Sequence, residues 1–246
     1  MITKTVIAHP LLSVIIPAFN EAGVIGKNLA IVDQYLEGLN IDYEIVVIND
    51  GSRDNTLQEI ARVSLCHLKV LSYENNRGKG FAVYEGMRVA TGQFRLFMDV
   101  DLSTDINEIR KFLDRMATGD NDVLVGDRNC QSLFKQERPW YRALLGRCFA
   151  LLSSVILTCP LGDFTCGFKM FTAQAAQMIF VRQRTFGWAF DAELILIAAR
   201  HGLRVDSLPV KWRHQGNSKV RILNASIVSF LELIRIRYND FKGIYK

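Results

Sequence analysis

Short apolar runs alternate with helix-like segments over the first half of the chain. The runs have the length and the bulky or β-branched side chains of buried strands, and they cover residues 12–16, 44–48, 68–71, 94–98 and 123–125. Apolar side chains recur at helical spacing between them, over residues 24–39, 57–63 and 81–90. This alternation predicts an α/β fold with a mostly parallel sheet that is covered by helices on both faces.

Polar residues follow several of these runs directly. Pro17 is expected to end the first strand and Asn20-Glu21 to follow it, while Asp50 comes after the second run. Asp99 and Asp101 follow the fourth run. Ligands of parallel sheets bind beyond the carboxyl ends of the strands, so we expect these side chains to gather along one rim.

The second half has a different pattern. Residues 139–158 predict an apolar helix that is interrupted by Arg142 and Arg147, and residues 162–169 predict a polar, glycine-containing loop. The remaining elements are expected to be a helix, an edge strand with a proline and an amphipathic helix, over residues 188–201, 205–212 and 224–245.

Composition narrows the class of protein. The chain has 246 residues, of which 49% are hydrophobic, so it can bury a core and is not a disordered protein. Its net charge of +5 favours an anionic partner: nucleic acid, anionic lipid or a phosphorylated substrate. Five cysteines without a C-x-x-C pair argue against a disulfide framework or zinc site and fit a reducing cytosol. No signal peptide or spanning apolar run is evident, which predicts a soluble or peripheral protein.

The Asp99-Val100-Asp101 segment is the main candidate for chemistry. In extended backbone two carboxylates spaced i, i+2 share a face, so both can reach one Mg²⁺ or Mn²⁺ ion or one nucleotide. The alternative is a solvated, aspartate-rich turn. The chain lacks the P-loop motif, the G-x-G-x-x-G dinucleotide fingerprint and the G-x-S-x-G elbow, so those enzyme classes are disfavoured.

Several motifs, in order, carry a resemblance to a known family. The segments VIIPAFNE, VINDGSRDNT, RGKGFAV, MDVDLS and GDFTCGFKMF resemble family-two inverting glycosyltransferases of the GT-A fold. The later segments GWAFDAELILIA, VKW and GNSK are similar to the branch that acts on polyprenyl phosphates and includes dolichyl-phosphate glucosyltransferases and dolichol-phosphate mannose synthases. The resemblance implies one domain over residues 1–246, with a nucleotide-sugar half to about residue 130 and an acceptor half after it.

The resemblance also implies roles for individual residues. Contacts to the donor nucleotide sugar are expected from Pro17, Phe19, Glu21, Asp50, Asp99, Val100, Arg128, Ser218 and Lys219. Arg128 stands in VGDR, where the family usually has GSR, and the aspartate in place of serine puts that loop in doubt. Arg142 is expected to bind the acceptor phosphate, Asp99 and Asp101 the metal, and Asp191 and Asp101 to be catalytic.

Some assignments have plain structural alternatives. Asp191 is either an orienting residue or weak base, or simply an acid in the first turn of a helix. Lys79 is expected to be a surface lysine, with contact to the donor phosphate as the alternative. His214 is expected to lie in a surface loop rather than to be a third metal ligand.

The expected reaction is inverting, metal-dependent transfer of a hexose to a polyprenyl phosphate. Glucose from UDP-glucose is the favoured donor, with Mg²⁺ or Mn²⁺ as cofactor. A phosphomonoester acceptor is already an anion near pH 7, because its second pKa is about 6, so no strong base is required. The alternatives are GDP-mannose as donor, a polysaccharide hydroxyl as acceptor, or a nucleotide-binding scaffold without activity. Nucleic acid is not an expected partner.

Two segments suggest a membrane surface. Residues 139–161 and the C-terminal helix combine apolar side chains with arginines, as helices in a membrane interface do. Ordinary packing on the sheet is the alternative. In the C-terminal helix the side chains of one face are Ile227, Val228, Leu231, Ile234 and Tyr238, with Arg235, Arg237 and Lys242 elsewhere. The expected location is the cytosolic face of a membrane, where the protein is peripheral or has a membrane-embedded partner subunit.

Overall fold

The computed structural model describes residues 9–128, 163–213 and 222–246. Within these residues seven strands form one sheet in the order β3-β2-β1-β4-β6-β5-β7. The strands are β1 Leu12–Ala18, β2 Tyr43–Asp50, β3 Leu68–Tyr73, β4 Phe94–Met98, β5 Val123–Asp127, β6 Phe168–Thr172 and β7 Val205–Pro209. All five strands predicted in the first half are present, and β7 is the predicted edge strand.

Most of the sheet is parallel, as predicted. Strands β3, β2, β1 and β4 run parallel, as do β5 and β7, while β6 is antiparallel to both of its neighbours. β6 corrects the prediction of a loop over residues 162–169, because the chain enters this strand at Phe168. The sequence did not predict this strand because the charged residue Lys169 interrupts its apolar run. In the structure Lys169 is fully buried.

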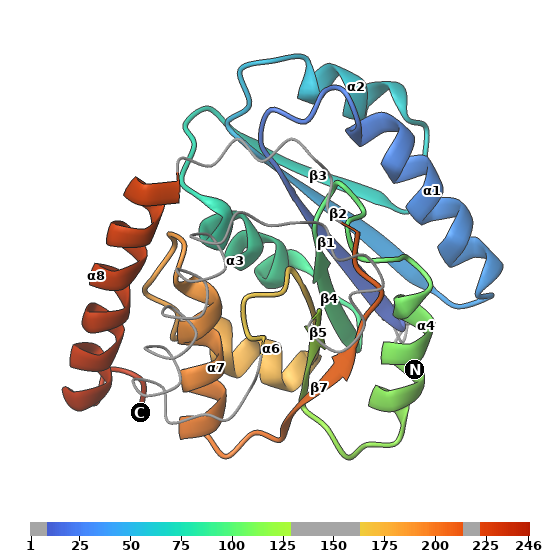
Figure 1. Ribbon diagram of the computed structural model, residues 1–246. Helices are drawn as coiled ribbons and strands as arrows, with labels where there is room; N and C mark the ends of the chain where they lie inside the picture. Colours follow the sequence, from blue (N-terminus) through green and yellow to red (C-terminus); the bar gives the residue numbers. More distant parts are fainter. Residues whose placement is uncertain (1–8, 129–162, 214–221) are drawn as a thin grey trace, which may run out of the picture.

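Helices cover both faces of the sheet, as Figure 1 shows. Helices α1, α2 and α4 lie on one side and α3, α6 and α7 on the other, and α8 lies against the outside of α7. Their bounds are α1 Ile25–Gly38, α2 Thr56–Arg62, α3 Lys79–Val89, α4 Glu108–Ala117, α6 Ala173–Phe180, α7 Phe190–Arg200 and α8 Ile222–Phe241. The predicted helix over residues 139–158 lies outside the described residues.

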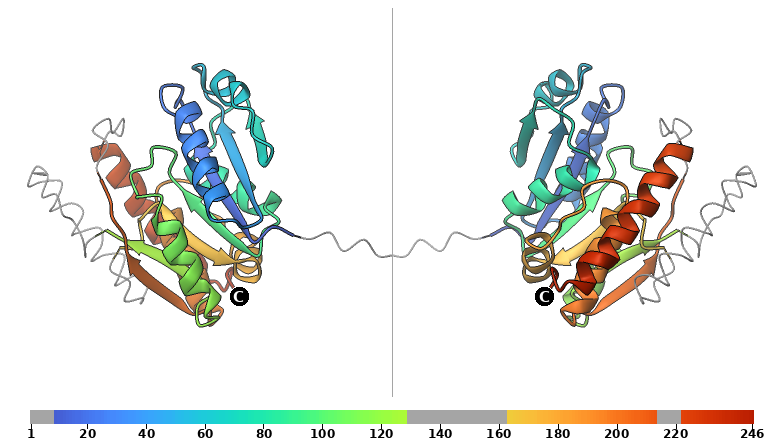
Figure 2. Two further views of the ribbon diagram at one scale, coloured as in Figure 1. Left: turned by 90° about the vertical axis from the view of Figure 1, so that its right-hand side faces the viewer. Right: turned by 90° about the vertical axis from the view of Figure 1, so that its left-hand side faces the viewer.

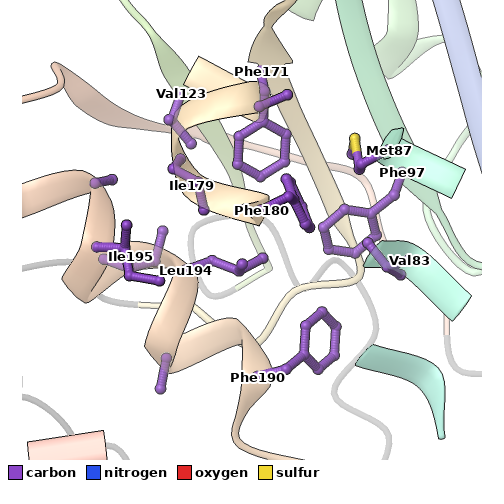
Figure 3. Close-up of a cluster of buried hydrophobic side chains, with 14 of the residues drawn as sticks. Val83, Met87, Phe97, Val123, Phe171, Ile179, Phe180, Phe190, Leu194 and Ile195 are labelled. Atoms are coloured by element: carbon purple, nitrogen blue, oxygen red, sulfur yellow. The ribbon is translucent and has the colours of Figure 1, made fainter. Parts of the chain in front are cut away.

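Each face of the sheet has its own hydrophobic core. On the side of α3, α6 and α7, the aromatic rings of Phe97, Phe171, Phe180 and Phe190 pack together (Figure 3). On the other side, α1 and α4 pack apolar side chains against β1, β2 and β4. Burial on both faces explains why the strands read as continuous apolar runs rather than alternating ones.

Pro17 does not end β1, contrary to the prediction. The strand runs on to Ala18, and Pro17 pairs with Ile48 of β2. The last pair between β1 and β4 is Ile15 with Phe97, so Pro17 lies beyond that ladder and its missing N–H breaks no bond in it.

Among the described helices, none has both the length and the apolar character to cross a bilayer.

Candidate functional site

The loops that follow β1 and β2 are joined to one another at the carboxyl edge of the sheet. The N–H of Asn20 donates to Ser52 Oγ at 2.9 Å, and the N–H of Arg53 donates to Asn20 Oδ1 at 2.8 Å. The N–H of Glu21 is held by Thr56 Oγ1 at 2.8 Å. Phe19 is exposed beside these contacts, so it is presented on a fixed loop at the predicted rim.

Asp50 is buried at the end of β2 and holds the segment before α3. Its carboxylate accepts the backbone N–H groups of Arg77 at 2.8 Å and Gly78 at 3.0 Å, and Asn76 Nδ2 at 2.9 Å. The structure therefore gives Asp50 a positioning role for this loop. Its contact with a nucleobase stays a prediction.

The loop held by Asp50 enters α3 at Lys79 between two constrained glycines. Gly78 has a φ of 97°, a conformation that favours glycine. The N–H of Gly80 donates to the carbonyl of Phe186 at 3.1 Å, and a Cβ on Gly80 would lie 2.8 Å from that oxygen. The backbone of Lys79 is thus fixed on both sides.

Asp99, Val100 and Asp101 lie in a turn rather than in extended backbone. β4 ends at Met98, and the carbonyl of Val100 accepts Asn28 Nδ2 of α1 at 2.8 Å. The two Asp101 oxygens accept the N–H and the hydroxyl of Ser103 at 2.9 and 2.7 Å. The i, i+2 argument for a shared face does not apply to a turn, but both carboxylates are at the predicted edge.

Asp99 forms an ion pair that the sequence did not predict. Its Oδ1 lies 2.5 Å from Lys79 Nζ, and the two side chains are 41% and 36% exposed. Desolvation lowers the pKa of Lys79 by disfavouring its charged form. The negative charge of Asp99 and, as a smaller effect, that of Asp191 outweigh this and raise the pKa above its ordinary value. Lys79 is therefore a cation of the candidate site, not an isolated surface lysine.

Arg128 is held by a carboxylate of the GDFTCGFKMF segment. Its Nε and one terminal nitrogen contact the two oxygens of Asp163, both at 2.7 Å, and the latter nitrogen also donates to Thr165 Oγ1 at 2.9 Å. Desolvation opposes the charge, but Asp163 and more weakly Asp99 raise the pKa of Arg128. The predicted phosphate contact of Arg128 would form beside this bidentate pair.

Asp191 is in the first turn of α7, as predicted, and is paired with Lys169 of β6. Lys169 Nζ lies 2.5 Å from Asp191 Oδ1 and 2.6 Å from the carbonyl of Cys166. The Lys169 side chain is 0% exposed and that of Asp191 8% exposed. Burial raises the pKa of the neighbouring Cys166 thiol to about 11, so this cysteine stays protonated near neutral pH.

The site thus contains two charged residues to which the sequence alone gives no role, and a third, Lys79, for which a site contact is only the alternative. Asp163 and Lys169 stand in a motif that carried the family resemblance, but neither had been assigned a function, and Lys79 had been expected on the surface. The signal that could have found Lys169 is a lysine inside an otherwise apolar run, because a buried charge needs a partner. Arg142, His214, Ser218 and Lys219 lie outside the described residues.

The carboxylates at this edge of the sheet fit a divalent ion that also binds the substrate. Asp99 and Asp101 offer carboxylate oxygens, and Mg²⁺ commonly binds through one or two carboxylates together with substrate phosphates. Within the described part of the chain, no group of three or more His, Cys, Asp or Glu side chains could hold a metal by itself. Asp99 and Asp101 are the residues that would hold the ion.

Sequence comparison places the chain among glycosyltransferases. The model of glycosyl transferase family 2 matches residues 13–180. A dolichyl-phosphate beta-glucosyltransferase of Trichomonas vaginalis is 33% identical over 250 residues, which cover 95% of this chain and 75% of the relative. A dolichyl-phosphate beta-glucosyltransferase of Saccharomyces cerevisiae is 31% identical, with 96% of this chain and 76% of the relative covered.

Solved structures share the fold. Glucosyl-3-phosphoglycerate synthase from Mycobacterium tuberculosis in complex with UDP has a TM-score of 0.69 to this chain, with 19% identity over 93% of this chain and 80% of that one. The same enzyme has been solved with Mn²⁺, UDP-glucose and phosphoglyceric acid, also at a TM-score of 0.69, with 18% identity. At this identity the likeness shows the GT-A fold alone. Since the family model matches most of its length, the chain belongs to glycosyltransferase family 2, as its motifs predicted.

Proposed function

We propose that this glycosyltransferase moves a hexose, glucose, from UDP-glucose to a polyprenyl phosphate of the dolichyl type, with inversion at the sugar. The observation that carries the proposal is the likeness to dolichyl-phosphate beta-glucosyltransferases over about 95% of the chain. The arrangement of charges at the carboxyl edge of the sheet supports it. A division into a donor half and an acceptor half belongs to the same proposal.

The donor would bind along the rim formed by the loops after β1, β2 and β4. Pro17, Phe19 and Glu21 would contact the nucleoside, with Asp50 holding the adjoining loop. Asp99 and Asp101 would hold Mg²⁺ or Mn²⁺, which supplies positive charge to the departing diphosphate. Arg128, and Ser218 and Lys219 outside the described residues, are the further donor contacts of the proposal.

A phosphate acceptor suits the state of Asp191. A hydroxyl acceptor needs a base within hydrogen-bond reach, but one oxygen of the buried Asp191 is held by Lys169. A polyprenyl phosphate arrives as an anion near pH 7, because its second pKa is about 6. The reaction then needs the acceptor to be bound and oriented, for which Arg142 is the proposed residue.

The lipid acceptor implies contact with a membrane, and α8 supplies a suitable surface. Its outward face exposes Leu231, Ile234, Tyr238 and Phe241, and Arg235 and Lys242 are exposed beside them. Apolar side chains bordered by cations are typical of helices in a membrane interface. Figure 2 shows α8 at the outside of the molecule, away from α1 and α2.

The cytosolic face is the proposed location. The cysteines described by the structure, Cys66 and Cys166, are free thiols, which fits a reducing compartment. A membrane-embedded partner subunit is a further part of the proposal and would be sought by co-purification from detergent extracts.

Sugar transfer to a short polyprenyl phosphate tests the proposal. We expect product from UDP-glucose in the presence of Mg²⁺ or Mn²⁺, little from GDP-mannose or UDP-N-acetylglucosamine, and loss of product with EDTA. A prenyl alcohol serves as the matched acceptor without phosphate. If none of these donors gives a product, the proposed transferase activity is refuted. If the prenyl alcohol is glycosylated at a similar rate, the proposal that the acceptor is a phosphate is refuted.

A further inference from the structure

We propose that Lys79 binds the diphosphate of the donor and that Asp191, anchored by Lys169, positions Lys79 instead of acting as a base. The inference rests on the proposed function for the class of ligand, a nucleoside diphosphate. It concerns two residues for which the sequence favoured other roles: a surface lysine and a weak base.

The first step is the location of Lys79. Its ammonium lies 2.5 Å from Asp99 Oδ1, and Asp99 is the carboxylate that would hold a metal shared with the diphosphate. A change in the side-chain conformation of Lys79 would be enough to bring its ammonium from this oxygen to the phosphates of a bound donor. Lysine is suited to such a contact, because its ammonium is a compact charge with three donors on a flexible stem. Partial exposure of Lys79, at 36%, leaves room for that movement.

The second step is the backbone that carries Lys79. It begins α3, an 11-residue helix, and the positive end of a helix favours anions nearby. Asp50 holds the two amides before Lys79, and the Phe186 carbonyl holds the amide after it. The ammonium can therefore move while its Cα stays fixed.

The third step is the row of alternating charges that continues behind Lys79. The start of α7 lies beside the start of α3, because a Cβ on Gly80 would lie 2.8 Å from Phe190 Cβ, so Asp191 comes next to the helix that carries Lys79. Asp191 is in turn held by Lys169, which lies against the Cys166 carbonyl and 5.1 Å from the centre of the Phe97 ring. Lys169 is fully buried and cannot reach a substrate. It fixes Asp191, and Asp191 keeps the Lys79 ammonium within the site when Asp99 is engaged elsewhere.

The charge balance agrees with this assignment. Asp99, Asp101, Asp163 and Asp191 bring four negative charges, and Lys79, Arg128 and Lys169 bring three positive ones, so these seven described residues leave one net negative charge. Lys169 and Arg128 are each held by a buried carboxylate. Lys79 is the cation of the three whose partner, Asp99, is itself substantially exposed at 41%.

Nucleotide binding without any acceptor tests the inference. Calorimetric Kd values for UDP with Mn²⁺ would be compared among wild type, Lys79→Met, Lys79→Arg and Asp191→Asn. A charge-assisted contact predicts an affinity loss of about 10- to 100-fold for Lys79→Met and a smaller loss for Lys79→Arg. Asp191→Asn should weaken UDP binding about 3- to 10-fold through the misplaced ammonium. Uridine, which lacks the diphosphate, should bind all four proteins alike.

Lys69→Met is the matched control. Lys69 also lies 2.5 Å from a carboxylate, Glu44, but at the opposite edge of the sheet where β2 and β3 begin. Its loss should leave the Kd for UDP unchanged. Thermal unfolding of each variant verifies that it is folded.

Two results would overturn the inference while leaving the proposed function intact. One is a Lys79→Met variant that binds UDP as tightly as wild type, or loses uridine affinity to the same extent. The other is an Asp191→Asn variant with unchanged UDP affinity and a kcat reduced by 100-fold or more, the signature of a general base. A wild type that binds neither UDP nor GDP would refute the proposed function and the inference together.

Discussion

Gly167 sets the position of Asp99 by having no side chain. A Cβ at this glycine would lie 2.2 Å from Asp99 Oδ2, far inside van der Waals contact. The carboxylate is the end of a rotatable side chain, so it would turn away rather than disrupt the sheet. Gly167 therefore leaves the space that the carboxylate proposed to bind the metal occupies.

We predict that Gly167→Ala weakens Mn²⁺-dependent UDP binding by about tenfold or more, because a displaced ligand loses a charge-assisted contact. The free energy of unfolding should change by only about 1 kcal/mol. Calorimetry and urea unfolding measure the two quantities. Gly38→Ala is the control, since a Cβ there meets nothing within 4 Å. Unchanged UDP affinity in Gly167→Ala would contradict the role given to this glycine.

Asp163 makes a pH-dependent contribution to stability through Arg128. Burial alone would raise the pKa of Asp163, but its hydrogen bonds and ion pair with Arg128 lower it below the ordinary value of 3.8. A carboxyl group with a lowered pKa in the folded state stabilises the fold above the pKa of the unfolded state. That contribution is lost as the pH falls through the folded-state pKa.

We predict that Asp163→Asn lowers the free energy of unfolding at pH 7 by about 1–3 kcal/mol. The difference from wild type should shrink below about pH 4, where the carboxyl group begins to be protonated in the unfolded state, and vanish once the pH has passed the lower folded-state pKa. Urea unfolding between pH 7 and pH 2 measures it. Asp114→Asn is the control, because its pair with Arg110 is exposed on both sides. A difference that persists unchanged to pH 2 would contradict the assignment.

At the scale of elements, α8 is apolar on two faces. Leu233 and Ile236 are buried, whereas Leu231, Ile234 and Tyr238 are exposed on the opposite side. The helix therefore packs on the protein and still offers an apolar surface to a partner. The proposed partner is an anionic membrane.

We predict that replacing Leu231 and Ile234 together by Gln weakens binding to anionic vesicles by tenfold or more, because two exposed apolar side chains of about 1.5–3 kcal/mol each leave the interface. Cosedimentation with vesicles measures it. Leu57→Gln, an exposed leucine on α2, should bind like wild type. Raised salt should weaken binding of all three proteins, since it screens the exposed cations. Equal binding by the double variant would exclude α8 as the surface.

The elements that the sequence predicted well are those with an uninterrupted apolar pattern, either a continuous run in a strand or a regular apolar face on a helix. β4 was predicted with its observed bounds, and α1 and α3 to within two residues. β6 was missed because Lys169 interrupts its apolar run, and α4 and α6 had no assignment. Periodicity predicted one apolar side of the C-terminal helix, without deciding between membrane contact and packing on the sheet. It could not show that Leu233 and Ile236, on another face, are the side chains that become buried.

The site was predictable in its location but not in its contacts. Acidic strand ends and a parallel sheet were enough to place Asp50, Asp99 and Asp101 at one edge. The pairs of Lys79 with Asp99 and of Lys169 with Asp191 join residues 20 and 22 positions apart. A single sequence has no local signal for such contacts, because they depend on which strands become neighbours.

At the scale of the whole molecule, α7 connects the site with the outer helix. Glu232 of α8 accepts the N–H of Ala189 at the start of α7 at 2.9 Å. Two residues after Asp191, the buried Glu193 accepts the hydroxyl of Tyr245 at 2.5 Å. The helix that carries Asp191 is thus fixed to the helix proposed to lie on the membrane, and membrane contact through α8 would set the orientation of the site relative to the bilayer.

Donor and metal should stabilise the whole fold together. A ligand that binds only the folded state adds about 2.7 kcal/mol at a concentration of 100 Kd, and each kcal/mol shifts the Tm of a domain of this size by about 2–4 °C. We predict that UDP with Mn²⁺ raises the Tm by about 5–10 °C in differential scanning fluorimetry. Either component alone should do much less, because in the proposed site Asp99 and Asp101 share the ion with the diphosphate. Asp101→Asn should abolish the joint effect, whereas a UDP shift that is equally large in EDTA would show that the nucleotide binds without a metal bridge.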